Sequence, residues 1–218
     1  MKSAKSKFHE ELNTYYAFNP GKRSFDMTGK NEIRAEILSK LRVMSAGERM
    51  EKSTKAIRNL EETAQFKGAG RIFCYASKSY EVQTQDLIRR MLGDGKEVYV
   101  PKTDKENRTL IVSQIMDFEK DLAAGAFGIL EPSKTREADI KKIEMWIIPG
   151  IAFDRRGYRV GHGKGYFDSF FRKNSVRGMK LGMAYSFQIV PRVEEKTYDV
   201  PVDMVVTERE VINCKGER

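Results

Sequence analysis

The sequence has few of the residues on which metal and thiol chemistry depend. Its 218 residues include two cysteines and two histidines. Cys74 and Cys214 are far apart and lack the C-x-x-C spacing of metal or redox sites, and two histidines rule out a multi-histidine metal site. Cys74 lies in the apolar run RIFCYA, which favours a small buried hydrophobe rather than a reactive thiol.

Long apolar runs are also missing. No stretch approaches the roughly 18 apolar residues that a bilayer requires, and the opening MKSAKSKFHEELN lacks the apolar core of a secretory signal. A cytoplasmic protein without a membrane segment is therefore expected. RNA-binding aromatic motifs, zinc-finger spacing and long basic runs are absent too, so the formal charge of +9 indicates attraction to anions without choosing between nucleic acid, nucleotides and phosphates.

Helical periodicity begins at Lys30, where Ile33, Ile37 and Leu41 recur on one face. The segment SAGE, residues 45–48, then has the form of a capping box and predicts a second helix running to about Phe66. Residues 1–28 show no lasting period, and we interpret them as an N-terminal extension of a domain over residues 29–218.

From residue 71 onward, short apolar runs alternate with helical segments. Strands are predicted in RIFCYA, KEVYVP, EMWIIPG, KLGMAYS and VDMVVTE, with LIVSQI as a further candidate. Helices are predicted in TQDLIRRMLGDG and over about 165–172, and FEKDLAAGAFGILEPS is interpreted as a polar excursion. This alternation predicts the α/β class: a single domain with a mostly parallel, open sheet flanked by helices on both faces.

The stretch VGHGKGYFDSFF places glycine at 161, 163 and 165, directly before a predicted helix. Its spacing fits neither the Walker A loop nor the dinucleotide-binding fingerprint. Bare backbone amides ahead of a helix nevertheless favour a phosphate. A glycine-rich hairpin without a ligand remains the alternative, and Asp168 is either a partner of the helix dipole or a ligand of Mg²⁺.

A longer segment around the glycine loop resembles a known family signature, which helps to choose between the alternatives for the loop and for Asp168. IIPGIAFDRRGYRVGHGKGYFDSFF closely resembles the signature of the 5-formyltetrahydrofolate cyclo-ligase family, approximately P-G-x-x-F-D-x-x-G-x-R-[LI]-G-x-G-x-G-Y-Y-D. KNEIR, YEVQT, LEP, YDVPVD and VVTE also resemble family segments, in the same order, so the resemblance covers about Lys30 to Glu210. It implies an α/β enzyme that uses ATP and Mg²⁺ to convert 5-formyltetrahydrofolate into 5,10-methenyltetrahydrofolate, releasing ADP and phosphate.

The resemblance also implies roles for particular residues. Glu81 and Tyr166 are expected to bind the folate, and Asp168 and Asp199 to hold Mg²⁺ directly or through water. The residues expected to bind ATP are Lys30, Arg34, Arg159, Val160, Gly161, His162, Gly163, Lys164, Gly165, Tyr166 and Phe167.

Some of these positions allow another interpretation or depart from the family pattern. Lys30 and Arg34, four apart, would otherwise suggest a solvated basic face. Asp203 is either a partner behind the metal ligands or a residue at the start of a strand, and we favour the second. Phe167 stands where the family usually has a second tyrosine, and His162 fills a variable position to which we assign no acid or base role.

Two other functions compete with a folate ligase. One is a non-catalytic relative on the same fold that binds RNA or another polyanion, suggested by the charge of +9 and the extra N-terminal segment. The other is a sugar-phosphate isomerase or acyl-CoA transferase, which would explain a phosphate loop but not the paired Asp168 and Asp199. We expect a monomer that binds small-molecule substrates, and we do not expect nucleic acid as a partner.

Overall fold

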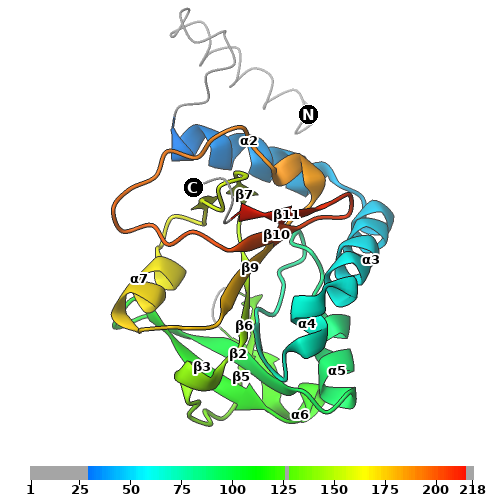
Figure 1. Ribbon diagram of the computed structural model, residues 1–218, viewed down its shortest axis with the longest axis vertical. Helices are drawn as coiled ribbons and strands as arrows, with labels where there is room; N and C mark the ends of the chain where they lie inside the picture. Colours follow the sequence, from blue (N-terminus) through cyan, green and yellow to red (C-terminus); the bar gives the residue numbers. More distant parts are fainter. Residues whose placement is uncertain (1–28, 126–127, 215–218) are drawn as a thin grey trace, which may run out of the picture.

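A seven-stranded sheet runs through the centre of the protein (Figure 1), in the order β11-β10-β9-β6-β1-β2-β3. The computed structural model describes residues 29–125 and 128–214. The five inner strands are parallel, whereas the edge strands β3 and β11 are antiparallel to their neighbours. The strands are β1 (Arg71–Cys74), β2 (Glu97–Asp104), β3 (Thr109–Ile115), β6 (Met145–Pro149), β9 (Met179–Met183), β10 (Met204–Val206) and β11 (Val211–Asn213).

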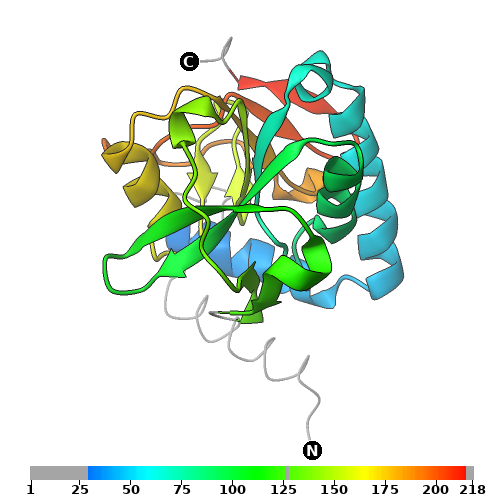
Figure 2. The same cartoon turned by 90° about the horizontal axis from the view of Figure 1, so that it is seen from below.

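Helices cover both faces of this sheet. In Figure 1, α3, α4 and α5 lie to the right of the strands and α7 to the left, and the view from below in Figure 2 shows the same division. The helices are α2 (Lys30–Val43), α3 (Ala46–Glu62), α4 (Ala64–Gly68), α5 (Gln85–Gly93), α6 (Phe118–Asp121) and α7 (Tyr166–Lys173), with short 3-10 turns η3 (Ile140–Lys142) and η4 (Ser186–Gln188). The predicted mostly parallel α/β sheet is confirmed.

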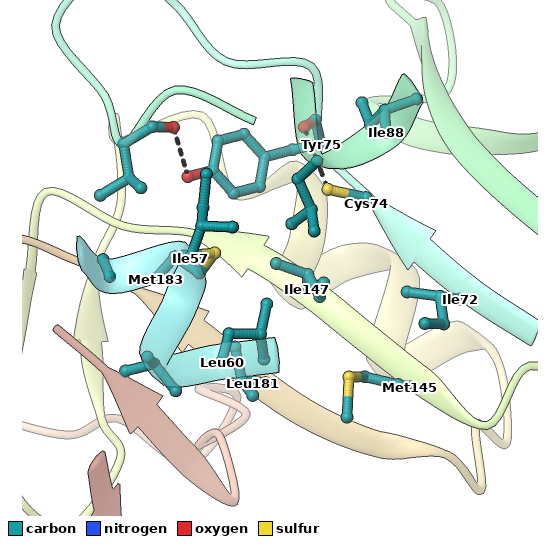
Figure 3. Packing of buried hydrophobic residues seen from close by; sticks show 14 of the residues in the cluster. Ile57, Leu60, Ile72, Cys74, Tyr75, Ile88, Met145, Ile147, Leu181 and Met183 are labelled. Carbon is teal, nitrogen blue, oxygen red and sulfur yellow. Dashed lines mark hydrogen bonds between the residues drawn. The ribbon is translucent and has the colours of Figure 1, made fainter. Parts of the chain in front are cut away.

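The alternation of side chains along the strands builds one core on each face. Ile72 and Cys74 of β1 join the core beneath α2 to α5, and Figure 3 shows them packed with Ile57 and Leu60 of α3. Phe73, between them in sequence, faces the other core, which contains the α7 residues Phe170 and Phe171 and the strand residues Trp146 and Ile148 of β6. Each central strand therefore stabilises both cores at once.

Side-chain caps mark the starts of α3, α4 and α6. Ser45 Oγ accepts the Glu48 amide at 3.1 Å, which confirms the predicted start of α3. A capping box also requires the Glu48 side chain to accept the backbone amide of Ser45. In the described part of the chain, the Glu48 carboxylate pairs with Lys52 instead, at 2.8 Å. The second helix was predicted to continue to about Phe66, but α3 ends at Glu62 and Thr63 caps the separate helix α4.

Two other expectations need correction. The predicted polar excursion contains α6 and a hairpin of β4 (Leu122–Ala124) and β5 (Leu130–Pro132), and strand β11 was not predicted. A second small hairpin, β7 (Ala152–Phe153) with β8 (Arg159–Val160), leads into the glycine loop. Within the described ranges, every helix is too short or too polar to span a membrane. The predicted N-terminal extension, residues 1–28, lies outside them.

Candidate active site

A cavity of about 350 Å³ opens at the carboxyl ends of β1, β2 and β6. Tyr75 and Ala76 follow β1, Thr103 belongs to β2, and Pro149 and Gly150 stand at the end of β6, and all five line the cavity. The chain continues from β1 to β2 on one side, while β6 pairs with β1 on the other. Ligands of open α/β sheets bind at such a switch in strand order. The fold therefore marks this cavity as the candidate active site.

The glycine loop forms one wall of the cavity. Gly163 and Gly165 adopt left-handed φ angles of 90° and 68°, which glycine tolerates far better than other residues. Gly165 is also the residue that caps α7, and Phe170 and Phe171 anchor this helix in the second core. The lining residues from this segment are Arg159, Gly161, His162, Lys164, Gly165, Tyr166, Phe167 and Asp168.

Helix α2 lies against the hairpin β7–β8 and brings two predicted ATP residues to the loop. Arg34 Nε donates to the carbonyl oxygen of Gly161 at 2.8 Å, and Lys30 forms an ion pair with Asp199. Both residues lie beside the loop rather than in the cavity wall. Val160 is fully buried, and its side chain packs in the core beneath α2, so only its backbone is available for contact with a ligand.

Arg159 is bonded to protein groups rather than directed at a ligand. Its Nη2 donates to Asp168 Oδ1 at 2.9 Å and its Nη1 to the carbonyl oxygen of Val200 at 2.6 Å. Burial lowers the pKa of this guanidinium, and the nearby charges of Asp168 and Asp199 oppose that shift. Arg159 thus positions Asp168 and joins the glycine loop to the segment around Asp199.

Two carboxylates near the glycine loop, Asp168 and Asp199, are the candidate metal ligands. In the described part of the chain, no three His, Cys, Asp or Glu side chains are grouped so that they could hold a metal ion by themselves. Mg²⁺ usually takes one or two carboxylates and completes its shell with water and substrate phosphates. Asp168 fits, because it lines the cavity and its bonds to described groups use Oδ1. Asp199 fits less well, because it is not among the residues that line the cavity and its carboxylate is already paired with the ammonium group of Lys30.

Asp203 has a structural position. It lies directly before β10, and its Oδ2 accepts the backbone amide of Lys180 in β9 at 2.9 Å. A backbone bond from the Asp203 amide to the carbonyl oxygen of Lys180 completes the link. These contacts agree with the interpretation of Asp203 as a residue at the start of a strand.

Glu81 reaches the cavity from the segment between β1 and α5. Its side chain is buried, its Oε2 accepts the Lys78 amide at 2.8 Å, and its Oε1 lies 3.2 Å from His162 Nε2. The backbone of this segment is held by two buried tyrosines: Tyr185 donates to the carbonyl oxygen of Glu81 and Tyr75 to that of Val82. His162, which had no predicted contact with Glu81, therefore links the glycine loop to the residue expected to bind folate.

The cavity residues that were not predicted include Lys78, Thr103 and Glu131. Lys78 stands close to Glu81, and burial together with the charge of Lys164 lowers the pKa of its ammonium, against the attraction of Glu81. Glu131 and Thr103 line another part of the wall. Glu131 belongs to the segment LEP. Whether its side chain points into the cavity depends on how β5 packs against β2, and the sequence of LEP alone does not reveal this packing.

Comparison with known proteins decides the family. The profile of the 5-formyltetrahydrofolate cyclo-ligase family matches residues 26–208. The chain belongs to this family. The resemblance read from the sequence is thereby confirmed, and with it the prediction that the chain is an enzyme of this ligase family.

Individual relatives agree with the family match. The 5-formyltetrahydrofolate cyclo-ligase of Mus musculus is 26% identical over 83% of this chain and 94% of its own length. The NMR structure of an Aquifex aeolicus 5,10-methenyltetrahydrofolate synthetase superimposes with a TM-score of 0.75 at 35% identity, covering 85% of this chain and 93% of that one. A Mycoplasma pneumoniae 5,10-methenyltetrahydrofolate synthetase shares the fold, with a TM-score of 0.67 at 23% identity over 82% and 98% of the two chains.

Proposed function

We propose that this protein converts 5-formyltetrahydrofolate into 5,10-methenyltetrahydrofolate with consumption of ATP and release of ADP and phosphate. One observation carries the proposal: the glycine loop and the buried carboxylate of Glu81 line the same cavity, joined by the contact from His162 to Glu81. The loop is the proposed phosphate site and Glu81 the proposed folate site. A ligase that phosphorylates one substrate with another needs both sites within one enclosed space.

The proposed reaction has two steps. The formyl oxygen first attacks the γ-phosphorus of ATP, so that an oxygen–phosphorus bond forms and the bond to ADP breaks. The resulting imino phosphate carries a good leaving group where the formamide had a poor one. N10 of the folate then attacks the formyl carbon and loses its proton, and the carbon–oxygen bond breaks to release phosphate. The protein has to align the two substrates and offset charge on the transferred group.

The glycine loop supplies the proposed phosphate contacts. The amides of residues 161–167 precede or begin α7, whose N-terminal dipole favours an anion. Lys164 lines the cavity and offsets charge on the transferring phosphoryl group. Lys30 and Arg34 support the phosphates from α2, Arg34 through its hold on the carbonyl oxygen of Gly161.

The folate is proposed to lie against the other wall. Glu81 holds it near the reacting nitrogen, and Tyr166 borders both substrates because it begins α7 at the edge of the cavity. Phe167 lacks the hydroxyl usual in the family, and its ring instead packs edge-on against Phe73, with ring centroids 6.1 Å apart. It contributes an apolar surface to the cavity rather than a hydrogen bond.

Asp168 is the proposed main ligand of Mg²⁺, with Asp199 as a second ligand directly or through water. When bound, the ion would neutralise negative charge on the ATP phosphates. Arg159 keeps Asp168 Oδ1 in place, so that its other oxygen remains available. Asp199 would hold the ion more strongly when Lys30 exchanges its carboxylate partner for a phosphate, which makes Lys30 a link between nucleotide and metal binding.

The main alternative is a non-catalytic relative that binds RNA or another polyanion. The charge of +9 motivates it. The cavity favours the ligase instead, because an enclosed space of about 350 Å³ has the size of a small-molecule site rather than of an RNA-binding surface. A monomer without nucleic acid and a cytoplasmic setting stay predictions.

The test is a direct assay of turnover. The protein is mixed with 5-formyltetrahydrofolate, ATP and magnesium, and the near-ultraviolet absorption of methenyltetrahydrofolate is followed. We expect product only when all three are present. Folded protein that forms no product over a range of magnesium concentrations would overturn the proposal, and salt-sensitive binding of RNA at near-physiological ionic strength would then favour the alternative.

A further inference from the structure

Glu131 is a buried carboxylate that the proposed chemistry does not use. Its exposed fraction is 8%, it belongs to β5, and it lines the cavity. Within the described ranges no Lys, Arg or His side chain pairs with it. A buried carboxylate without a cation is costly unless hydrogen-bond donors compensate for its lost hydration.

Thr103 supplies only part of that compensation. Its backbone amide and its hydroxyl both donate to Glu131 Oε1, at 3.2 and 2.5 Å. Oε2 accepts no hydrogen bond from another described residue. Thr103 of β2 therefore fixes Oε1 of the carboxylate, while Oε2 can accept a hydrogen bond from a ligand.

Gly125 leaves room for this arrangement. A Cβ atom at position 125 would lie 2.6 Å from both Cγ and Oε2 of Glu131, closer than side chains approach one another. The nearby lining is largely apolar: Pro101, Leu110 and Ile129 stand on the same strands or beside them. A flat ring that is apolar on its faces and carries N–H donors at its edge matches this wall.

We propose that Glu131, oriented by Thr103, recognises the N–H edge of the pteridine ring and thereby selects folates. This inference rests on the proposed function, since the 2-amino-4-oxo ring of 5-formyltetrahydrofolate presents an exocyclic amine and a ring N–H side by side. The amine donates to Glu131 Oε2. Glu131 thus determines which substrate binds, whereas Glu81 holds the folate near its reacting nitrogen and the glycine loop holds the phosphates.

The experiment combines a protein variant with a modified substrate. Glu131→Met keeps the approximate length of the side chain and removes its acceptors. We expect it to raise KM for 5-formyltetrahydrofolate about 10- to 100-fold, the range for a lost hydrogen bond to a charged group. KM for ATP should stay unchanged. The 2-desamino analogue should show a similar penalty with the unmodified protein and little further penalty with Glu131→Met, because the same contact is already missing.

Two further variants keep the test independent of folding. Thr103→Val removes the hydroxyl that orients Glu131 and should raise the folate KM by a smaller factor. Glu106→Met, at an exposed acid in the turn between β2 and β3, is the matched control and should change neither KM. Thermal melts identify any variant that fails to fold. If Glu131→Met does not fold, the folate KM of Thr103→Val, measured with the substrate and with its 2-desamino analogue, tests the role of Glu131.

The outcomes separate this inference from the proposed function. Normal turnover with an unchanged folate KM in Glu131→Met, or an equal analogue penalty in both proteins, overturns the role of Glu131 alone. Absence of turnover in the unmodified protein overturns the proposed function. Calorimetric titration with 5-formyltetrahydrofolate and its analogue then still tests the recognition, and lack of folate binding overturns both.

Discussion

Asp168 is the side chain on which the proposed metal site depends, and Arg159 fixes its orientation. Asp168→Asn keeps an oxygen that can accept from Arg159 but removes the charge that attracts Mg²⁺. We expect the magnesium concentration for half-maximal turnover to rise by roughly tenfold or more, or turnover to be lost. The protein should still fold, with a lowered melting midpoint, because the buried guanidinium of Arg159 loses a neighbouring negative charge. The measurement is a magnesium titration of the initial rate beside a thermal melt.

The control for this variant is Asp94→Asn, at an exposed carboxylate after α5 and away from the cavity. It should leave the magnesium dependence as it was. An unchanged magnesium requirement in Asp168→Asn would remove Asp168 from the metal site and leave it only its bond to Arg159.

Single residues differ in how far the sequence could reveal their position. Asp168 and Lys164, which the family signature predicts for the site, both line the cavity, because a continuous motif folds as one loop. Asp154, in the same motif, is a fully buried acceptor for the amides of Arg156, Tyr158 and Val193. Its role could not be predicted, because Val193 reaches it from a segment far along the chain.

The glycine loop allows a test of its own contribution to ATP binding. Gly161 has open space around the position of a Cβ atom and no left-handed φ, so Gly161→Ala should change the free energy of unfolding by no more than about 0.5 kcal/mol. If the phosphates approach this backbone, the added methyl group will raise KM for ATP several-fold and leave KM for the folate unchanged. Steady-state kinetics in both substrates give the answer.

Gly93→Ala is the matched control for this loop variant. Gly93 also has open space at the Cβ position, but it lies in α5, where alanine should stabilise the helix by about 0.5–1 kcal/mol without affecting either KM. An unchanged KM for ATP in Gly161→Ala would mean that the phosphates contact another part of the loop. Gly165→Ala is less informative, because its φ of 68° adds about 1–2 kcal/mol of strain.

The pattern of apolar residues predicts the helices and the inner strands, but it does not predict which strands pair with each other. The apolar runs over 71–74 and 145–149 are short and uninterrupted, as expected for strands buried on both faces. The β4–β5 hairpin was missed because Leu122–Ala124 and Leu130–Pro132 are too short to show alternation. Since this hairpin carries Glu131 to the cavity, the sequence did not predict that Glu131 lies in the site.

The two cores share every central strand, and this arrangement should make the molecule unfold as one unit. Trp146, the only tryptophan, is fully buried in the core beneath α7, with its ring centroid 4.9 Å from that of Phe73. Leu60 of α3 is fully buried in the opposite core. A change at Leu60 therefore tests whether loss of packing on one face is felt on the other.

Leu60→Ala should destabilise the protein by about 2–5 kcal/mol, which for a chain of this size lowers the melting midpoint by about 4–20 °C. We expect Trp146 fluorescence and far-ultraviolet circular dichroism to report the same lowered midpoint, because Trp146 cannot stay packed once the strands it shares with α3 separate. Met50→Ala, on the exposed face of the same helix, should leave both midpoints nearly unchanged. A fluorescence midpoint that stays at its original temperature while the dichroism midpoint falls would show that the two cores melt separately. The sheet would then hold the cavity residues Tyr75, Thr103 and Pro149 together less firmly than its continuous pairing implies.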